Sequence, residues 1–293
     1  MNLLVFDVGG TSVKYGLWQN EQLSKIQSFP TPATWEELKQ QLVAIKEQTN
    51  QDVELAGVAF STVGSVEQDK GIILGASAVK YIHHFPIKAE LEQVFALPTT
   101  FENDANCAGL AEVWQGAAQG VERAVFAVIG TGVGGAILKN GIIEHGHNLY
   151  AGEFGFTILD AENNGTFSGL ASPVRMAERY CDRIGVPHGT HSGKEVFELA
   201  ENDDANAVIE VETFYRYVAA GLFNIQLTVD PEIIMIGGAL SANLPLITEI
   251  GNRVNAIITT AGIKDFKAKI VPCKFNNDAN LLGAVKNFIN RNI

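Results

Sequence analysis

The amino-acid sequence predicts an α/β protein. Short apolar runs with the character of strands alternate with longer stretches in which apolar residues recur at helical spacing, the pattern of α/β folds. In addition, a glycine-rich turn between two apolar runs occurs close to the N-terminus, and Val133-Gly134-Gly135 repeats its Val8-Gly9-Gly10. We interpret the two as a weak internal duplication, one copy in each of two lobes. A coincidence of two glycine turns is the simpler alternative.

The elements follow in order from apolar spacing and turn residues. The chain opens with a predicted hairpin whose first strand is Leu3–Phe6, and Thr34-Trp35-Glu36-Glu37 has the form of a capping box at a helix start. The further predicted elements are a helix over residues 34–49, a buried strand over Val53–Phe60, a helix over Pro86–Leu97, a second hairpin from about Ala124, a helix over Asn206–Val229 and a strand over Glu232–Ile236.

The chain has 293 residues, enough for two lobes that each bury a core. We expect an N-terminal lobe over residues 1–118 and a C-terminal lobe over residues 119–293, with a C-terminal helix at about 280–293 packed back on the first lobe. The formal net charge of −12 disfavours nucleic acid and anionic membranes as partners, since both attract a positive surface.

The cysteines and the distribution of apolar residues indicate the cellular compartment of the protein. Cys107, Cys181 and Cys273 are widely spaced and form no CxxC pair, which disfavours a disulfide framework or a cysteine zinc cluster. Basic residues do not precede the first apolar run, and no apolar stretch approaches the roughly 18 residues of a membrane span. We therefore expect a cytoplasmic protein.

An acidic residue followed by a glycine turn opens the chain. Asp7 ends the first apolar run, directly before the turn that contains Gly9, Gly10 and Thr11. Such a turn lets backbone N–H groups approach a ligand closely, and the carboxylate suits the magnesium ion that accompanies a nucleotide polyphosphate. The pattern favours phosphoryl transfer, and an ordinary β-hairpin is the alternative. Lys14 is either a phosphate partner or a surface lysine.

The segment Gly130–Gly135 contains the string GxGxxG of dinucleotide-binding turns. That motif must lead into a helix, whereas the residues around Asn140-Gly141 predict a strand, a type I′ turn and another strand. We therefore interpret the segment as a second phosphate clamp with Thr131, Gly132 and Gly134 at the ligand. A dinucleotide-dependent oxidoreductase is the weaker alternative.

Glu102-Asn103-Asp104-Ala105 precedes a predicted helix. Asp104 is either the helix cap or a general base, because a carboxylate at a helix start stays ionised at neutral pH and can accept a proton from a hydroxyl. Glu153 lies between glycines in an irregular stretch, where a carboxylate is usually solvated. His145 and His147 lie two residues apart, but no third ligand has a recognisable spacing, so zinc is disfavoured there.

On these motifs the chain resembles the ROK family (repressor, open reading frame, kinase) of bacterial sugar kinases, part of the actin-like and hexokinase-like ATPase group. The resemblance covers nearly the whole length and keeps the order of the motifs. These are Phe6–Thr11 with Lys14, the Gly64 loop, Glu102–Asn106, Gly130–Gly135, Ala151–Glu153 and Ile236–Ala239.

The resemblance implies two ribonuclease-H-like lobes around a cleft for ATP and a sugar. It places Asp7 near magnesium, the glycine turns around the phosphates and Gly237-Gly238 near the adenosine. A homodimer is also implied. A sugar-binding regulator of the same family, without kinase activity, is the alternative, although the opening hairpin at residue 3 and the negative charge disfavour an N-terminal DNA-binding domain.

The resemblance further implies that Asp104 is the base toward a hexose 6-hydroxyl, while Gly64, Asn103 and Glu153 hold the sugar. The chain departs from zinc-containing members, in which a histidine and a cysteine cluster follow the glutamate. Here Phe156 stands in place of the histidine and residues 157–173 contain no cysteine, so no zinc site is expected. Because that histidine borders the sugar in the relatives, the substrate stays open between glucose, an N-acetylhexosamine such as N-acetylmannosamine, and a β-glucoside.

Overall fold

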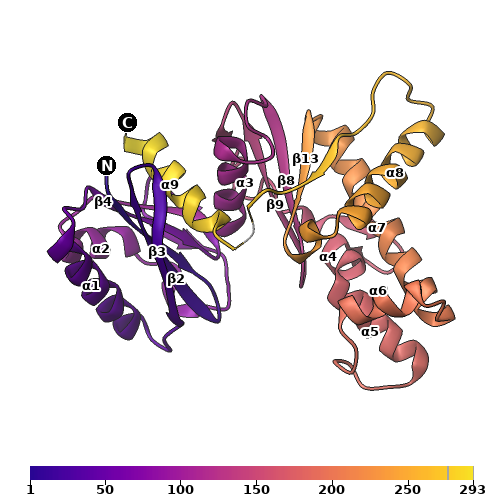
Figure 1. The fold of residues 1–293 in the computed structure, drawn as a ribbon, viewed down its shortest axis with the longest axis horizontal. Helices are drawn as coiled ribbons and strands as arrows, with labels where there is room; N and C mark the ends of the chain where they lie inside the picture. The colour runs from indigo at the N-terminus through magenta and orange to yellow at the C-terminus, as the bar shows by residue number, and fades with distance from the viewer. Residues whose placement is uncertain (276, 293) are drawn as a thin grey trace. The chain divides into compact units, whose positions relative to one another are not determined.

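The computed structural model describes residues 1–275 and 277–292, which divide into two compact units (Figure 1). The first unit contains Met1–Trp114, Gly146–Tyr150 and residues 277–292, and the second contains Gln115–His145 and residues 151–275. Each unit is built on its own five-stranded sheet. None of the helices in this described part of the chain is long and apolar enough to cross a membrane.

The sheet of the first unit has the strand order β3-β2-β1-β4-β7. The strands are β1 (Leu3–Val8), β2 (Ser12–Gln19), β3 (Gln22–Pro30), β4 (Gly57–Thr62) and β7 (Thr99–Asn103), and a small hairpin is formed by β5 (Ser65–Glu67) and β6 (Ile72–Leu74). The first three strands are antiparallel, whereas β4 is parallel to both β1 and β7. Parallel neighbours need crossover connections, and helices supply them here.

The α-helices that the structure describes in this unit are α1 (Trp35–Asp52), α2 (Ile87–Phe95), α3 (Asp104–Gln115) and α9 (Ala279–Asn292). Alternate residues of β1, Leu4 and Phe6, lie in a core with Trp35 of α1 and Leu91 of α2. Helix α9 packs on β1, β4 and β7 (Figure 1). It also meets α3 so closely that a Cβ on Gly283 would lie 1.7 Å from the carbonyl oxygen of Cys107.

The second unit repeats this strand order as β10-β9-β8-β13-β14. Its strands are β8 (Arg123–Ile129), β9 (Val133–Lys139), β10 (Ile142–Ile143), β13 (Ile233–Gly237) and β14 (Ile270–Pro272), with a short hairpin of β11 (Ile158–Asp160) and β12 (Gly165–Thr166) beside them. Again three strands are antiparallel, and the fourth is parallel to its two neighbours. The shared order supports the duplication, and the predicted α/β class is confirmed.

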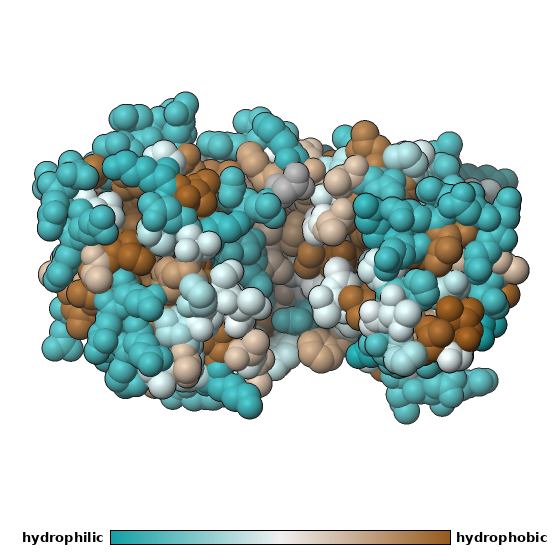
Figure 2. All heavy atoms as spheres, turned by 60° about the horizontal axis from the view of Figure 1, so that its bottom comes forward, coloured by the Kyte–Doolittle hydropathy of each residue, from teal (hydrophilic) through white to brown (hydrophobic). Residues whose placement is uncertain are grey.

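Helices of the second unit bury the apolar side chains of its sheet. They are α4 (Phe167–Ala171), α5 (Pro173–Ile184), α6 (Gly193–Glu201), α7 (Ala205–Val229) and α8 (Leu244–Thr260). Val125 and Ile234 of the sheet share a core with Phe214 and Leu222 of α7 and Ile250 of α8. The face of the molecule drawn in Figure 2 is largely hydrophilic, with apolar residues exposed in separate patches.

Most predicted elements are present with shifted ends. The capping box is formed, since the Glu37 amide donates to the Thr34 hydroxyl at 3.3 Å and the Thr34 amide donates to the Glu37 carboxylate at 3.2 Å. The strand predicted to begin at Val53 begins at Gly57, because Val53 is the C-cap of α1. Asn140 and Gly141 have φ of 52° and 73°, as a type I′ turn requires, and a strand follows as predicted.

One predicted correspondence is wrong. Gly134 and Gly135 lie inside β9, so the counterpart of the turn Gly9–Thr11 is Gly130–Gly132, between β8 and β9. A Cβ on Gly135 would lie 2.5 Å from the carbonyl oxygen of Phe126 and 2.6 Å from a ring carbon of Phe154. Glycine is therefore required in this strand because the neighbouring groups pack closely against it. In the sequence, such a glycine cannot be distinguished from one in a turn.

Candidate active site

The carboxyl ends of three parallel strands bring the candidate residues of the first unit to one edge of its sheet. Asp7 on β1, Ser61 on β4 and Glu102 on β7 are partners in the strand register, and Asn103 and Asp104 follow Glu102 directly. Neighbouring strands are about 4.8 Å apart, so roughly 10 Å separate the backbones of Asp7 and Glu102. Ligands of open α/β sheets bind at such an edge.

The turn after β1 is fixed by contacts on both sides. Thr31 donates its hydroxyl to the carbonyl oxygen of Gly9 at 2.6 Å, and the Gly9 amide donates to the carbonyl of Ser12 at 3.1 Å. A Cβ on Gly10 would lie 2.7 Å from the Cβ of Ala78, so only glycine allows this approach. The predicted phosphate turn is therefore a closely packed segment of backbone.

Asp7 is held by two side chains from distant parts of the chain. The hydroxyl of Ser61 donates to Oδ1 at 2.7 Å, and Nδ2 of Asn280, on α9, lies 3.2 Å from each carboxylate oxygen. Burial raises the pKa of Asp7 from its usual 3.8, whereas these hydrogen bonds and the charge of Lys14 oppose that increase. The carboxylate keeps partial exposure and offers oxygen atoms only, so it fits magnesium, which proteins hold by one or two carboxylates together with water and phosphate.

Lys14 lies opposite Asp7 in the register of β1 and β2. Its ammonium group donates to the carbonyl oxygen of Asn277 and lies 3.9 Å from Oδ1 of Asp278. In this structure the predicted phosphate partner is thus engaged by the residues that precede α9.

The junction of β7 and α3 separates two roles that the sequence could not assign. Oδ1 of Asn103 accepts hydrogen bonds from the amides of Ala105 at 2.9 Å and Asn106 at 3.2 Å, which makes Asn103 the N-cap. Its Nδ2 donates to the carbonyl oxygen of Gly64 at 3.1 Å. Asp104, which is partly exposed at the first helical position, accepts from the Ala105 amide at 2.8 Å. The alternative of Asp104 as the helix cap is therefore wrong.

Glu102 was not predicted as a functional residue, yet it is completely buried beneath this junction. One carboxylate oxygen accepts from the Asn103 amide at 2.7 Å and from Nδ2 of Asn106 at 2.9 Å, and the other accepts from Nε2 of Gln68 at 2.7 Å. A buried carboxylate needs such partners. Its only sequence signal was its position directly before Asn103-Asp104.

Gly64 occupies a backbone conformation that favours glycine, with φ of 96°. A Cβ there would lie 2.7 Å from Cε1 of His83. His83 in turn shares a 2.7 Å hydrogen bond with the hydroxyl of Ser77, and burial lowers the pKa of His83. These contacts fix the loop that contains Gly64, whose carbonyl oxygen accepts a hydrogen bond from Asn103.

In the second unit, the predicted phosphate turn and the Gly237-Gly238 turn are neighbours. The amide of Gly130 donates to the carbonyl oxygen of Gly132 at 2.9 Å, and the Val133 amide donates to the hydroxyl of Ser168 at 2.9 Å. Gly237 ends β13, and a Cβ on Gly238, with φ of 81°, would lie 3.1 Å from the carbonyl oxygen of Ile129.

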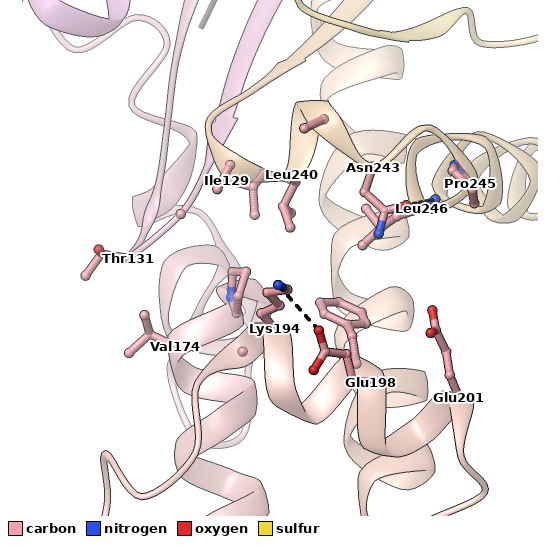
Figure 3. Close-up of a pocket in the computed structure, with 16 residues that line it drawn as sticks. Ile129, Thr131, Val174, Lys194, Glu198, Glu201, Leu240, Asn243, Pro245 and Leu246 are labelled. Carbon is pink, nitrogen blue, oxygen red and sulfur yellow. Dashed lines mark hydrogen bonds and ion pairs between the residues drawn. The ribbon is translucent and has the colours of Figure 1, made fainter. Parts of the chain in front are cut away.

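A cavity of about 770 Å³ adjoins this pair of turns (Figure 3). In Figure 3, Ile129 and Leu240 lie on one side, and Lys194 and Glu198 of α6, whose charged groups are 3.5 Å apart, lie on the other. The lining is mostly apolar and comes from the Gly130 turn, the starts of α5 and α8, helix α6, and the 3-10 helix Ala239–Ala242. Its size and mostly apolar lining suit a small molecule with an apolar part.

Glu153 precedes a 3-10 helix, Phe154–Phe156, that is pressed against β9. A Cβ on Gly152 would lie 2.7 Å from the carbonyl oxygen of Gly135. Burial raises the pKa of Glu153 from its usual 4.5, while the Phe156 side chain is 70% exposed. The loop therefore fixes the backbone, while the Glu153 carboxylate is half-buried and the Phe156 ring, three residues later, is exposed.

The two histidines that the sequence analysis considered as zinc ligands, His145 and His147, lie in the loop before Glu153. His145 is partly buried and His147 is exposed. Over residues 1–275 and 277–292, no group of three or more His, Cys, Asp or Glu side chains could hold a metal ion. The three cysteines are buried and form no disulfide, and burial raises the pKa of Cys107 well above its usual value.

Comparison with known proteins identifies the family of this chain. The family model of the ROK family matches residues 4–290. A β-glucoside kinase of Listeria monocytogenes is 30% identical, over 99% of this chain and 98% of the relative. A ROK family protein of Streptococcus pneumoniae TIGR4, solved with sucrose, superimposes with a TM-score of 0.89 at 33% identity over 99% of both chains. A ROK hexokinase of Thermus thermophilus gives 0.87 at 25% identity, also over 99% of both chains. The chain therefore belongs to the ROK family.

Proposed function

We propose that this chain is an ATP-dependent sugar kinase that transfers the γ-phosphoryl group to the 6-hydroxyl of a hexose or hexose derivative. The main support is the junction of β7 and α3, where Asn103 caps the helix and Glu102 fixes the backbone. The capping role is thus filled by a neighbour, and a partly exposed Asp104 stands at the same sheet edge as Asp7. Relatives named as β-glucoside kinase and hexokinase support the reaction class.

Asp104 would accept the proton of the attacking sugar hydroxyl. Such general-base assistance contributes about 10² to 10⁴ in rate. Asn103 donates one amide hydrogen to Gly64, and its second one would donate to a sugar hydroxyl. Gly64 would border the sugar, and the carboxylate of Glu153 would accept bonds from adjacent hydroxyls. Because phosphoryl transfer depends mainly on positioning and charge neutralisation, these groups suffice on the sugar side.

Backbone amides of two turns would hold the nucleotide phosphates. The Gly9 and Gly130 amides already donate within their own turns, so the donors would be the amides of Gly10 and Thr11 after β1 and those of Thr131 and Gly132 after β8. Thr131 would add a hydroxyl donor. Asp7 would hold magnesium, which supplies neutralisation of phosphate charge when bound. The cavity beside Gly237-Gly238 would take the adenine base, and Lys14 would turn from Asp278 toward phosphate.

The sugar itself is left open between glucose, an N-acetylhexosamine and a β-glucoside. A relative solved with sucrose shows that a family member accepts a ligand with more than one ring. The exposed ring of Phe156, three residues after Glu153, would suit an apolar substituent on the sugar. We also infer from the family resemblance a cytoplasmic homodimer, which light scattering after size-exclusion chromatography and cell fractionation would test.

The experiment is ADP release from ATP and Mg²⁺ over a panel of hexoses, N-acetylhexosamines and β-glucosides. We expect release that depends on one class of sugar, and a large loss in Asp104→Asn. Asp69→Asn is the matched control, since Asp69 is 89% exposed and pairs with Arg291 at the surface. A folded wild type that releases no ADP with any sugar contradicts the proposal, and full activity of Asp104→Asn contradicts the assignment of the base.

A further inference from the structure

The start of α9 contacts both charged residues of the first hairpin. Asn280, in the first turn of the helix, donates to the carboxylate of Asp7, and Asn277 and Asp278, just before the helix, contact the ammonium group of Lys14. The Asn280–Asp7 contact joins residues that are 273 positions apart in the chain. Three residues of one short segment thus contact the two charged side chains of the predicted nucleotide site.

The geometry at Asp7 leaves its carboxylate little rotational freedom. Nδ2 of Asn280 is equidistant from the two oxygens, at 3.2 Å, while the Ser61 hydroxyl donates to Oδ1 alone at 2.7 Å. Ser61 is completely buried on the neighbouring strand, so its position is fixed. A donor that spans both oxygens and a second donor on one of them define the plane of the carboxylate.

Helix α9 is itself anchored, so Asn280 is a rigid donor. Gly283 meets the backbone of Cys107 on α3 without room for a Cβ. Asn287, two turns further along α9 and buried, donates to the carbonyl oxygen of Phe101 at 3.1 Å. These contacts hold the helix on the sheet independently of Asp7, which separates the role of Asn280 from the packing of the helix.

We propose that Asn280 is a positioning residue that orients the Asp7 carboxylate for the metal–nucleotide complex. This inference rests on the proposed kinase function. Groups that orient a metal ligand typically change metal affinity by about 10- to 100-fold when they are removed. The ligand class is a divalent cation bound together with a nucleoside diphosphate or triphosphate, and the C-terminal helix thereby becomes part of the nucleotide site.

The test uses Mn²⁺ as the probe, because electron paramagnetic resonance counts free Mn²⁺ without any turnover. Titrations of the full chain with ADP present are compared between wild type, Asn280→Ala and Ser61→Ala. The matched control is Asn287→Ala, an asparagine of the same helix that contacts the sheet and not Asp7. Melting temperature and sugar binding by calorimetry are recorded for every variant.

We expect Asn280→Ala and Ser61→Ala to weaken Mn²⁺ binding by about 10- to 100-fold, with sugar affinity unchanged. Asn287→Ala should lower the melting temperature and leave Mn²⁺ binding as in the wild type. If the wild type binds Mn²⁺ with ADP and the Mn²⁺ affinity of Asn280→Ala lies within about twofold of it, the inference about Asn280 is overturned and the proposed function is not. A wild type that binds no Mn²⁺ with ADP overturns both the inference and the proposed function. An equal loss in Asn287→Ala would show that helix packing, and not orientation of Asp7, controls the site.

Discussion

Replacing Asp104 by asparagine isolates the proposed base from the fold around it. The amide oxygen of the new side chain can still accept the hydrogen bond that the Ala105 amide now donates at 2.8 Å, and the N-cap on Asn103 is untouched. The variant loses two things: a group that can accept a proton, and the negative charge of the carboxylate in the first turn of α3. The variant therefore tests chemistry with little structural change.

In Asp104→Asn, the expected loss of catalytic rate is much larger in free energy than the expected loss of stability. Removal of a general base costs about 10² to 10⁴ in rate, or roughly 3–5 kcal/mol at 1.36 kcal/mol per tenfold. The lost interaction of the carboxylate with the helix dipole is worth about 0.3–1 kcal/mol, which lowers the melting temperature by up to about 4 °C in a protein of this size. We expect kcat to fall at least a hundredfold while the KM for the sugar changes little.

The assay is steady-state ADP release together with thermal unfolding of the same preparations. Asn103→Ala gives the contrasting pattern, because loss of the N-cap costs about 0.5–2 kcal/mol in stability and the KM for the sugar should rise. A folded Asp104→Asn variant whose kcat stays within tenfold of the wild type would refute the reasoning, since another group would then accept the proton.

Three further predictions concern packing, titration and the nucleotide cavity. Gly283→Ala places a Cβ where the Cys107 carbonyl now lies, so we expect a loss of about 1–3 kcal/mol in unfolding free energy, measured by denaturant unfolding; unchanged stability would contradict the close helix contact. Because burial raises the pKa of Glu153, its ionised form opposes folding above that pKa, and the effect vanishes below 4.5. Glu153→Gln should therefore melt higher than the wild type at pH 8, with a difference that shrinks toward pH 4.5, and a pH-independent difference would argue against burial as the cause. Val174 lines the cavity and is 41% exposed. A glutamate there would repel the nucleotide phosphates by about 1 kcal/mol, so Val174→Glu should raise the KM for ATP about fivefold. An equal rise in the KM for the sugar would exclude a specific effect on the nucleotide.

Local patterns predicted much of the fold. The capping box at Thr34 and the turn at Asn140-Gly141 depend on neighbours a few residues apart, so the sequence contains all the information needed. The six motifs in their order likewise carried the resemblance to the ROK family. These features required no knowledge of the tertiary structure.

The contacts that complete the candidate site were beyond the sequence. Asn103 and Asp104 are both favoured N-cap residues, and only the backbone geometry distinguishes them. The donor from Asn280 to Asp7 depends on the docking of the last helix, which no local pattern predicts. The burial of Glu102 was equally hidden, since glutamate is usually exposed.

The most direct test of a sugar 6-kinase is the identity of the reaction product. Each sugar that stimulates ADP release is incubated with ATP, Mg²⁺ and the wild-type protein, and the product is analysed by ³¹P–¹H correlation spectroscopy. We predict a new phosphoester signal coupled to the two protons on carbon 6, in an amount equal to the ADP formed. A phosphate coupled to the anomeric proton, or release of inorganic phosphate alone, would contradict the account.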